Sequence, residues 1–248
     1  MREAGRNGSG RGRLGSALSG LAMAVGCVLF LGGFAWGAVL YQPYTVPTAS
    51  MAPTIGQGDR VLAQRIDGEQ VRRGDVVVFT DSAWGDMPMV KRAVGVGGDK
   101  IVCCTKDGRL SVNGKPVEEP YLQGGGKAPA SLTPFKVAVP DGELFMMGDH
   151  RDESLDSRVH LGDGNHGAVP RESVDARVDS VVWPVNGAGM MRPATNFESL
   201  SGGISHPGPL PLIGTAIAAG AVLVLGGAAI GSLAQRVSRG RARVPARA

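Results

Sequence analysis

A serine and a lysine from separate segments are the residues of this chain with the clearest potential for chemistry. Ser50 stands in the segment TVPTASMAPT, where Pro47 and Pro53 flank it and favour an extended loop that displays its hydroxyl. Lys91 stands in VKRAVGVGGD, at the start of an apolar, glycine-rich run. A lysine that is buried among apolar groups loses its proton more readily, and it can then take the proton of a serine hydroxyl. Taken alone, Ser50 also fits an ordinary turn, and Lys91 also fits an exposed strand.

A third polar segment, GDHRDESLDSR at residues 148–158, follows the apolar run ELFMM. Its aspartates, arginines and serines can form charge-assisted hydrogen bonds with one another and hold a nearby lysine in place. Alternation along a strand puts Lys91 and Arg92 on opposite faces, so that one of them can point inward. The alternative is that residues 148–158 form a solvated loop without a role in positioning the lysine.

Two long uncharged runs flank these segments. Residues 16–40 and 209–233 each contain about 25 residues without a charge, which is enough to cross a hydrocarbon layer of about 30 Å as a helix. The first run is longer than the apolar stretch of a cleaved secretory signal, roughly 7 to 15 residues, and is predicted to be a retained anchor. The second lacks the polar face of a core helix and is predicted to be a second span.

The charge distribution indicates how these spans are oriented. The formal charge is +4, yet the first 15 residues alone carry +3 and the last 13 carry +5, which leaves about −4 for the residues between them. An excess of arginine beside a span marks the cytoplasmic side, so both termini are predicted to be cytoplasmic and the central domain extracytoplasmic. We expect no nucleic-acid partner, although the basic tails leave that alternative open.

The central region has the pattern of short strands separated by turns. Brief runs rich in Val, Ile and Phe are bounded by Gly, Asp or Pro, and Asn113-Gly114 lies between alternating residues, as in a tight hairpin. The predicted strands are residues 59–65, 75–80, 89–94, 100–104, 143–147 and 175–185, and the predicted hairpin is residues 110–117. The fold class is therefore mainly β, an antiparallel sheet domain flanked by an N-terminal and a C-terminal transmembrane helix.

Several segments fall outside this pattern. Residues 118–140 are predicted to be an excursion from the sheet, and the Gly, Pro and Ser content of residues 186–208 predicts a linker. The predicted organisation is a basic tail (1–15), a transmembrane helix (16–40), the extracytoplasmic domain (41–185), the linker (186–208), a transmembrane helix (209–234) and a second basic tail (235–248).

The three cysteines do not predict a disulfide framework. Cys27 lies within the first apolar run, and Cys103 and Cys104 are adjacent, which makes a bond between them strained. We interpret these two as buried small hydrophobic residues, with a redox or intermolecular role as the alternative. His160, Asp163 and His166 could be imagined as metal ligands, but their segment HLGDGNHG has the character of a glycine loop, so no metal site is predicted.

The order of the motifs is more specific than any of them alone. SMAPT after an N-terminal span, then GDVVVF, KRAVGVGGD and GDHRDESLDSR closely resemble the motif set of the type I signal peptidases, which are serine proteases with a Ser-Lys dyad. The resemblance covers roughly residues 41–184. The Gly, Ala and Arg bias and the second apolar run are typical of an actinobacterial member. His150 departs from the family, which more often has Asn at that position, and this leaves the pH profile open.

The resemblance implies a role for each matching residue. Ser50 corresponds to the nucleophile and Lys91 to the general base, while Thr48 and the Ser50 backbone N–H correspond to the oxyanion hole. Ser154 corresponds to the serine that orients the lysine. The residues that correspond to packing and structural support of the site are Met51, Asp149, Arg151, Asp156 and Arg158.

The resemblance also implies the reaction and the partners. The expected activity is removal of N-terminal signal peptides from exported preproteins at Ala-X-Ala cleavage sites, at the surface of the membrane lipid and without a cofactor. Two alternatives remain: a maturation peptidase for one pilus or conjugation component on the same fold, and a non-catalytic membrane-tethered binding domain. A binding domain would have no need of Ser50 and Lys91 together.

Overall fold

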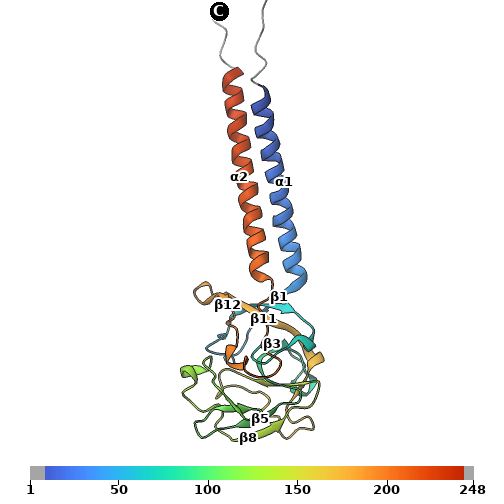
Figure 1. Ribbon diagram of the computed structural model, residues 1–248, viewed down its shortest axis with the longest axis vertical. Helices are drawn as coiled ribbons and strands as arrows, with labels where there is room; N and C mark the ends of the chain where they lie inside the picture. The colour runs from blue at the N-terminus through green and yellow to red at the C-terminus, as the bar shows by residue number, and fades with distance from the viewer. Residues whose placement is uncertain (1–8, 243–248) are drawn as a thin grey trace, which may run out of the picture. The chain divides into compact units, whose positions relative to one another are not determined.

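The computed structural model describes residues 9–242, which divide into two compact units (Figure 1). One unit consists of two long helices, and the other is a β domain, Leu40–Gly208. The predicted basic tails, 1–15 and 235–248, lie partly outside the described residues.

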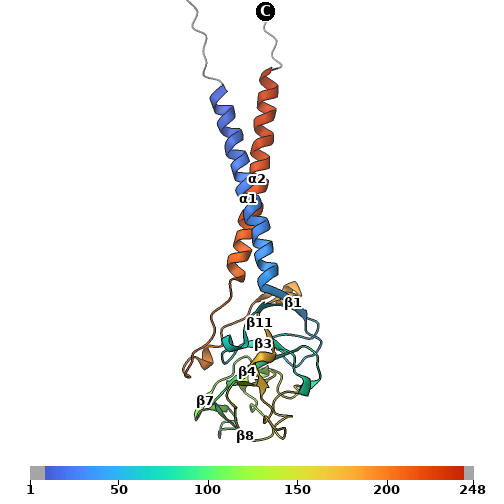
Figure 2. The ribbon, with the colours of Figure 1, turned by 90° about the vertical axis from the view of Figure 1, so that its right-hand side faces the viewer.

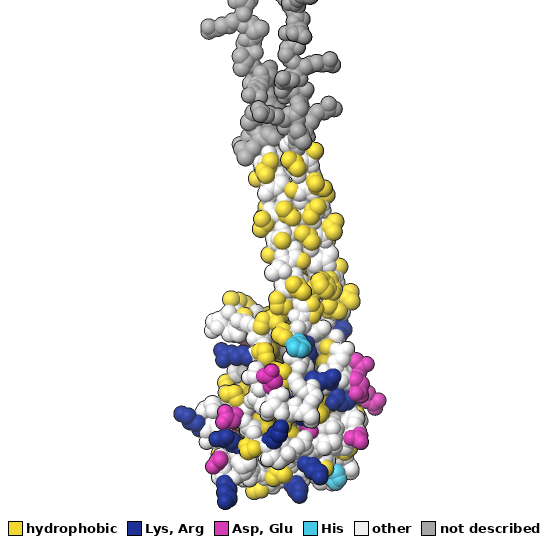
Figure 3. Space-filling view, in the orientation of Figure 1, with side chains coloured by type: hydrophobic (Ala, Val, Ile, Leu, Met, Phe, Trp, Pro, Cys, Tyr) yellow, Lys and Arg dark blue, Asp and Glu magenta, His cyan; other side chains and the backbone are white. Residues whose placement is uncertain are grey.

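The helical unit pairs α1 (Ser9–Leu40) with α2 (Leu210–Ala242). The two helices run antiparallel and cross, as Figure 2 shows, and Gly26 of α1 lies directly against Gly220 of α2. The Ser19 hydroxyl donates a 2.7 Å hydrogen bond to the backbone carbonyl of Gly227. Both helices contain a stretch long and apolar enough to cross a membrane, Ala17–Leu40 and Leu210–Ser232. Their outward-facing side chains are largely hydrophobic, whereas charged side chains are spread over the β domain (Figure 3).

The β domain is built on a large antiparallel sheet with the strand order β1-β2-β11-β3-β4-β9-β10, and β12 pairs with β11. Its centre is apolar because all four residues of β3 and five of the eight residues of β4 are buried. The bounds of these strands are β1 (Tyr41–Thr45), β2 (Arg60–Arg65), β3 (Val76–Phe79), β4 (Met89–Val96), β9 (Glu143–Met147), β10 (Val169–Pro170), β11 (Val174–Trp183) and β12 (Gly189–Met190).

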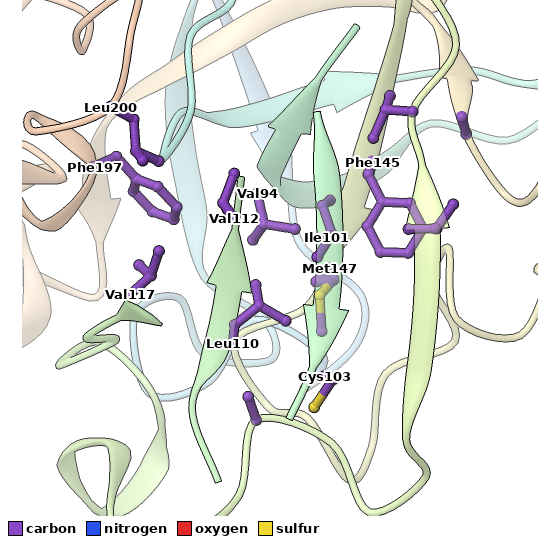
Figure 4. Packing of buried hydrophobic residues seen from close by; sticks show 14 residues of the cluster. Val94, Ile101, Cys103, Leu110, Val112, Val117, Phe145, Met147, Phe197 and Leu200 are labelled. Carbon is purple, nitrogen blue, oxygen red and sulfur yellow. The ribbon is translucent and has the colours of Figure 1, made fainter. Parts of the chain in front are cut away.

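A smaller antiparallel sheet has the strand order β7-β6-β5-β8. Its strands are β5 (Lys100–Cys103), β6 (Leu110–Val112), β7 (Lys115–Val117) and β8 (Phe135–Ala138), and Asn113-Gly114 forms the turn between β6 and β7. Apolar side chains of this sheet pack with Val94, Phe145 and Met147 of the large sheet into one core (Figure 4). Short 3₁₀ helices complete the domain: η1 (Gly68–Gln70), η2 (Ser82–Trp84), η3 (Gln123–Gly126), η4 (Arg171–Ser173), η5 (Val185–Gly187) and η6 (Thr195–Phe197).

The predicted mainly β, antiparallel fold class is confirmed. Every strand and the hairpin predicted from the sequence have a counterpart, and β9 has the predicted bounds. The sequence did not predict β1, β8, β10 or β12. β1 contains Pro43 and follows an apolar helix without a break, and β8 lies within the glycine-rich excursion, so neither shows a clear strand pattern.

The segment predicted to be a linker, residues 186–208, differs from that expectation. It contributes β12 to the large sheet, and Phe197 and Leu200 are buried in the core, where Figure 4 shows them near Val112 and Val94. The linker was predicted from composition, because glycine and proline are frequent in the segment. Two apolar residues, Phe197 and Leu200, are nonetheless enough to anchor the segment in the core of the β domain.

The interpretation of Cys103 and Cys104 was wrong in one respect, because the structure joins them in a disulfide. The prediction rested on the strain of the ring that two adjacent cysteines close when they form a disulfide. The peptide bond between them is cis and their Cα atoms are 2.9 Å apart, which brings the two side chains together. Cys103 is nonetheless buried in the core, as predicted.

Candidate active site

Ser50 and Lys91 meet in the interior of the β domain. Ser50 lies in a tight turn after β1, and Lys91 lies on β4 opposite Val77 of β3. The Lys91 Nζ atom donates a hydrogen bond of 2.7 Å to the Ser50 Oγ atom. Both residues are buried, with exposed fractions of 6% for Ser50 and 5% for Lys91. The hydroxyl and the amine are therefore in direct contact, in a place where water competes little for either.

Burial changes the acidity of the lysine. Desolvation lowers the pKa of Lys91 from its ordinary 10.5 to about 8, and the positive charge of Arg158 also lowers it. The carboxylates of Asp156 and Asp149 act in the opposite direction, because they stabilise the ammonium form. A substantial fraction of Lys91 is thus neutral at mildly alkaline pH, as a general base requires.

Thr48 lies beside this pair. Its Oγ1 atom is 3.2 Å from Ser50 Oγ, and either hydroxyl can donate the hydrogen bond. Thr48 is thus a hydroxyl donor next to the atom that would attack a carbonyl. Met51 is fully buried in a cluster with Val46 and Ile55, and this cluster anchors the turn that carries Ser50.

Ser154 lies close to the turn that carries Ser50. Gly148 has no side chain, and the Ser154 hydroxyl and the Ser50 backbone carbonyl occupy the space where its Cβ atom would be. Ser154 is buried, yet among the described residues Lys91 donates to Ser50 and not to Ser154. The structure therefore places Ser154 near the pair.

Asp149 connects the serine turn to β4. Its carboxylate receives two hydrogen bonds from the Arg92 guanidinium, at 2.8 and 2.6 Å, and one of 2.5 Å from Thr54. Arg92 also donates a 2.7 Å hydrogen bond to the backbone carbonyl of Gly74. The next residue, His150, donates its backbone N–H to the Ser50 carbonyl at 3.0 Å. Strand alternation suggested that one of Lys91 and Arg92 points inward, but both are buried, and Arg92 is a supporting residue.

Asp156 is held by Arg158 and by the backbone of Gly148. It accepts two hydrogen bonds of 2.8 Å from the Arg158 guanidinium and one of 3.0 Å from the Gly148 backbone N–H. Burial alone would raise the pKa of Asp156, but the contacts with Arg158 outweigh burial and hold the pKa below its ordinary value. Asp156 is therefore a carboxylate at neutral pH, near enough to influence Lys91.

Arg151 belongs to a buried hydrogen-bond network with two residues that the sequence did not indicate, Glu119 and Tyr121. It forms a buried, bidentate ion pair with Glu119, at 3.0 and 2.6 Å, and the Tyr121 hydroxyl donates to the same carboxylate. The Arg92 guanidinium lies 3.9 Å above the centre of the Tyr121 ring. No local motif marks Glu119 or Tyr121, because only the tertiary fold brings the excursion at 118–140 against residues 148–158.

The histidines add little to the site. His150 Nδ1 is 3.5 Å from Glu153, and His160 stacks on the Trp84 ring and contacts Asp163 at 2.9 Å. No group of three or more His, Cys, Asp or Glu residues suited to a metal ion occurs among the residues that the structure describes.

An antiparallel β domain that buries a serine hydroxyl against a lysine amine defines a class of protein, the serine hydrolases that use an amine in place of histidine. The family model for signal peptidase, peptidase S26, matches residues 18–183. This match spans well over half of the chain, and the chain therefore belongs to the signal peptidase family, peptidase S26. It is thus a peptidase of the hydrolase class.

Signal peptidases of two bacteria agree with this assignment. Signal peptidase I of Bacillus licheniformis is 40% identical over 160 residues, which cover 60% of this chain and 80% of that protein. A probable signal peptidase I of Mycobacterium leprae (strain TN) is 32% identical over 199 residues, with 58% of this chain and 68% of that protein covered. A crystal structure of a signal peptidase I from Enterococcus faecalis V583 covers 43% of this chain and 94% of its own, at 26% identity and a TM-score of 0.35.

Proposed function

We propose that this peptidase removes N-terminal signal peptides from exported preproteins, with Ser50 as the nucleophile and Lys91 as the general base. The observation that carries the proposal is the 2.7 Å hydrogen bond between Lys91 Nζ and Ser50 Oγ in a buried site. A neutral lysine at this distance takes the hydroxyl proton as the oxygen attacks a peptide carbonyl.

The remaining groups fit the later steps. Thr48 Oγ1 and the Ser50 backbone N–H donate hydrogen bonds to the oxyanion. Protonated Lys91 returns its proton to the leaving amine, and a water molecule then hydrolyses the acyl-enzyme with Lys91 again as the base. Ser154 orients the lysine, and the ion pairs of Asp149, Asp156, Arg151 and Arg158 keep these groups in register. No cofactor takes part in this sequence of steps.

The proposed substrates carry small residues before the cut, typically Ala-X-Ala, and we expect shallow pockets that exclude larger side chains to select them. The test uses the full chain in detergent with a purified preprotein whose signal ends in Ala-X-Ala. A single cut after the second Ala supports the proposal. Cleavage only of a pilin-type precursor would favour the more specialised maturation peptidase, and binding without cleavage would indicate a tethered binding domain.

The proposed organisation places residues 16–40 and 209–234 across the membrane, residues 41–185 outside and both basic tails in the cytoplasm. It is supported by the uncharged span within each helix and by the arginines that flank the two spans. Protease added to the outer face of intact cells should digest the β domain and spare epitope tags at both termini. Digestion of a C-terminal tag would contradict the second span.

The lowered pKa of Lys91 predicts a pH profile. The base is active when neutral, so kcat/KM should rise with pH below about 8 and level off above it. The profile is measured with the preprotein between about pH 6 and pH 10. Lys100→Ala, which removes an exposed lysine of β5, should leave the profile unchanged. A flat profile for the unmodified protein would contradict the role of Lys91 as a base.

A further inference from the structure

The segment at residues 189–208, here called the C-terminal strap, lies beyond the region matched by the family model, which ends at residue 183. It is nonetheless attached to the β domain at several points. Met191 N–H donates to the Asp179 carbonyl at 2.8 Å, and the Ser205 hydroxyl donates to Asp75 at 2.7 Å. The Arg73 guanidinium donates to the Ser201 carbonyl at 2.5 Å.

Two residues of the strap pack closely against Gly74. This glycine has a φ of +88°, and the space where a Cβ atom would lie is filled by Ala194 and the edge of the Phe197 ring. Phe197 is fully buried, so its ring leaves the Gly74 peptide little room to move. The backbone of Gly74 is fixed on its other side by the hydrogen bond from its N–H to the Ala93 carbonyl, at 2.7 Å.

Gly74 is directly linked to the proposed active site. Its carbonyl accepts the 2.7 Å hydrogen bond from Arg92, and Arg92 holds Asp149 through two further hydrogen bonds. Asp149 accepts from Thr54, and the adjoining His150 N–H donates to the Ser50 carbonyl. A continuous path of side-chain packing, hydrogen bonds and backbone therefore connects Phe197 to Ser50.

We propose that the C-terminal strap is a positioning element of the peptidase, in which Ala194 and Phe197 hold Gly74 and thereby set the Arg92–Asp149 pair that supports Ser50. This inference rests on the proposed function, because it assigns the strap to the same site. The pair is almost completely buried, so a shift of Gly74 cannot be compensated by water. A displacement of about 1 Å in the reacting groups lowers the rate by up to about 10²-fold, while a substrate bound mainly elsewhere keeps its affinity.

The test compares two buried residues of the same strap in the full chain. Phe197→Ala should lower kcat about 10-fold with KM unchanged. Leu200 belongs to the same core, but its atoms are not among the three nearest to the Cβ position of Gly74. Leu200→Ala should therefore reduce thermal stability to a similar extent and keep kcat within about twofold. Equal effects of the two variants on kcat, or no effect of either, would overturn the proposal.

A second variant guards against loss of folding in Phe197→Ala. Ala194→Gly removes a single methyl group from the contact with Gly74 and should lower kcat a few-fold with little change in the melting temperature. Unchanged kcat in Ala194→Gly would also overturn the proposal. A failure of the proposed function is distinguishable, because the unmodified chain would then leave the preprotein uncut.

Discussion

Ser50→Ala and Lys91→Ala should each reduce preprotein cleavage by roughly 10⁴- to 10⁶-fold, to the detection limit of the assay. The hydroxyl and the amine share one hydrogen bond, so removal of either partner ends the same proton transfer. The double variant should be no worse than either single variant, because groups that act as a unit are not additive. Single-turnover cleavage of the preprotein measures all three.

Controls separate the chemistry from the fold. Ser82→Ala and Lys100→Ala remove exposed residues of the same types and should retain full activity. Lys91→Arg should fail like Lys91→Ala, because a guanidinium stays protonated and cannot act as a base. Circular dichroism and the melting temperature establish that each variant is folded. Substantial turnover in a folded Ser50→Ala or Lys91→Arg variant would refute the assignment of roles.

Thr48→Ala should lower kcat by about 10²- to 10³-fold, or roughly 2.7 to 4 kcal/mol, with KM little altered. The Thr48 hydroxyl lies 3.2 Å from Ser50 Oγ, so it is close to the oxyanion that forms when Ser50 attacks. A donor to that oxyanion stabilises the transition state much more than the bound substrate. Steady-state kinetics with the preprotein separate kcat from KM.

Two further substitutions at this position decide between a chemical and a steric role. Thr48→Ser keeps the hydroxyl and should retain most activity, whereas Thr48→Val keeps the β-branched shape without the donor and should behave like Thr48→Ala. If Thr48 merely fits an extended backbone, Val should be the better substitute and Ser the poorer one. The order of the two activities is the outcome to compare.

Local patterns were sufficient to predict most of the domain. Valine-rich runs bounded by turn residues indicated the central strands, and the Asn113-Gly114 pair indicated the hairpin of the small sheet. Those signals are local, since strand propensity and turn chemistry act over a few residues. The strap was not predicted, because Phe197 and Leu200 become buried only through contacts with strands far away in the chain.

Some residues of the site could likewise be predicted from local motifs, and others could not. Ser50 and Lys91 could be proposed because their motifs follow one another in a recognisable order, and the structure places the two side chains in contact. Glu119 and Tyr121 could not, because nothing near them in the sequence distinguishes a buried partner of Arg151 from a solvated loop residue. The vicinal disulfide was missed for a local reason, since the prediction did not consider a cis peptide bond.

The buried pairing of Glu119 with Arg151 restricts how this protein can evolve. Both side chains are almost completely enclosed, so loss of one partner leaves an uncompensated charge in the interior, at a cost of about 3 to 5 kcal/mol. That cost is comparable to the whole stability of a marginal domain, roughly 5 kcal/mol. A lineage can therefore exchange the pair only when both positions change almost together, and the two residues should covary although 32 positions separate them in the chain.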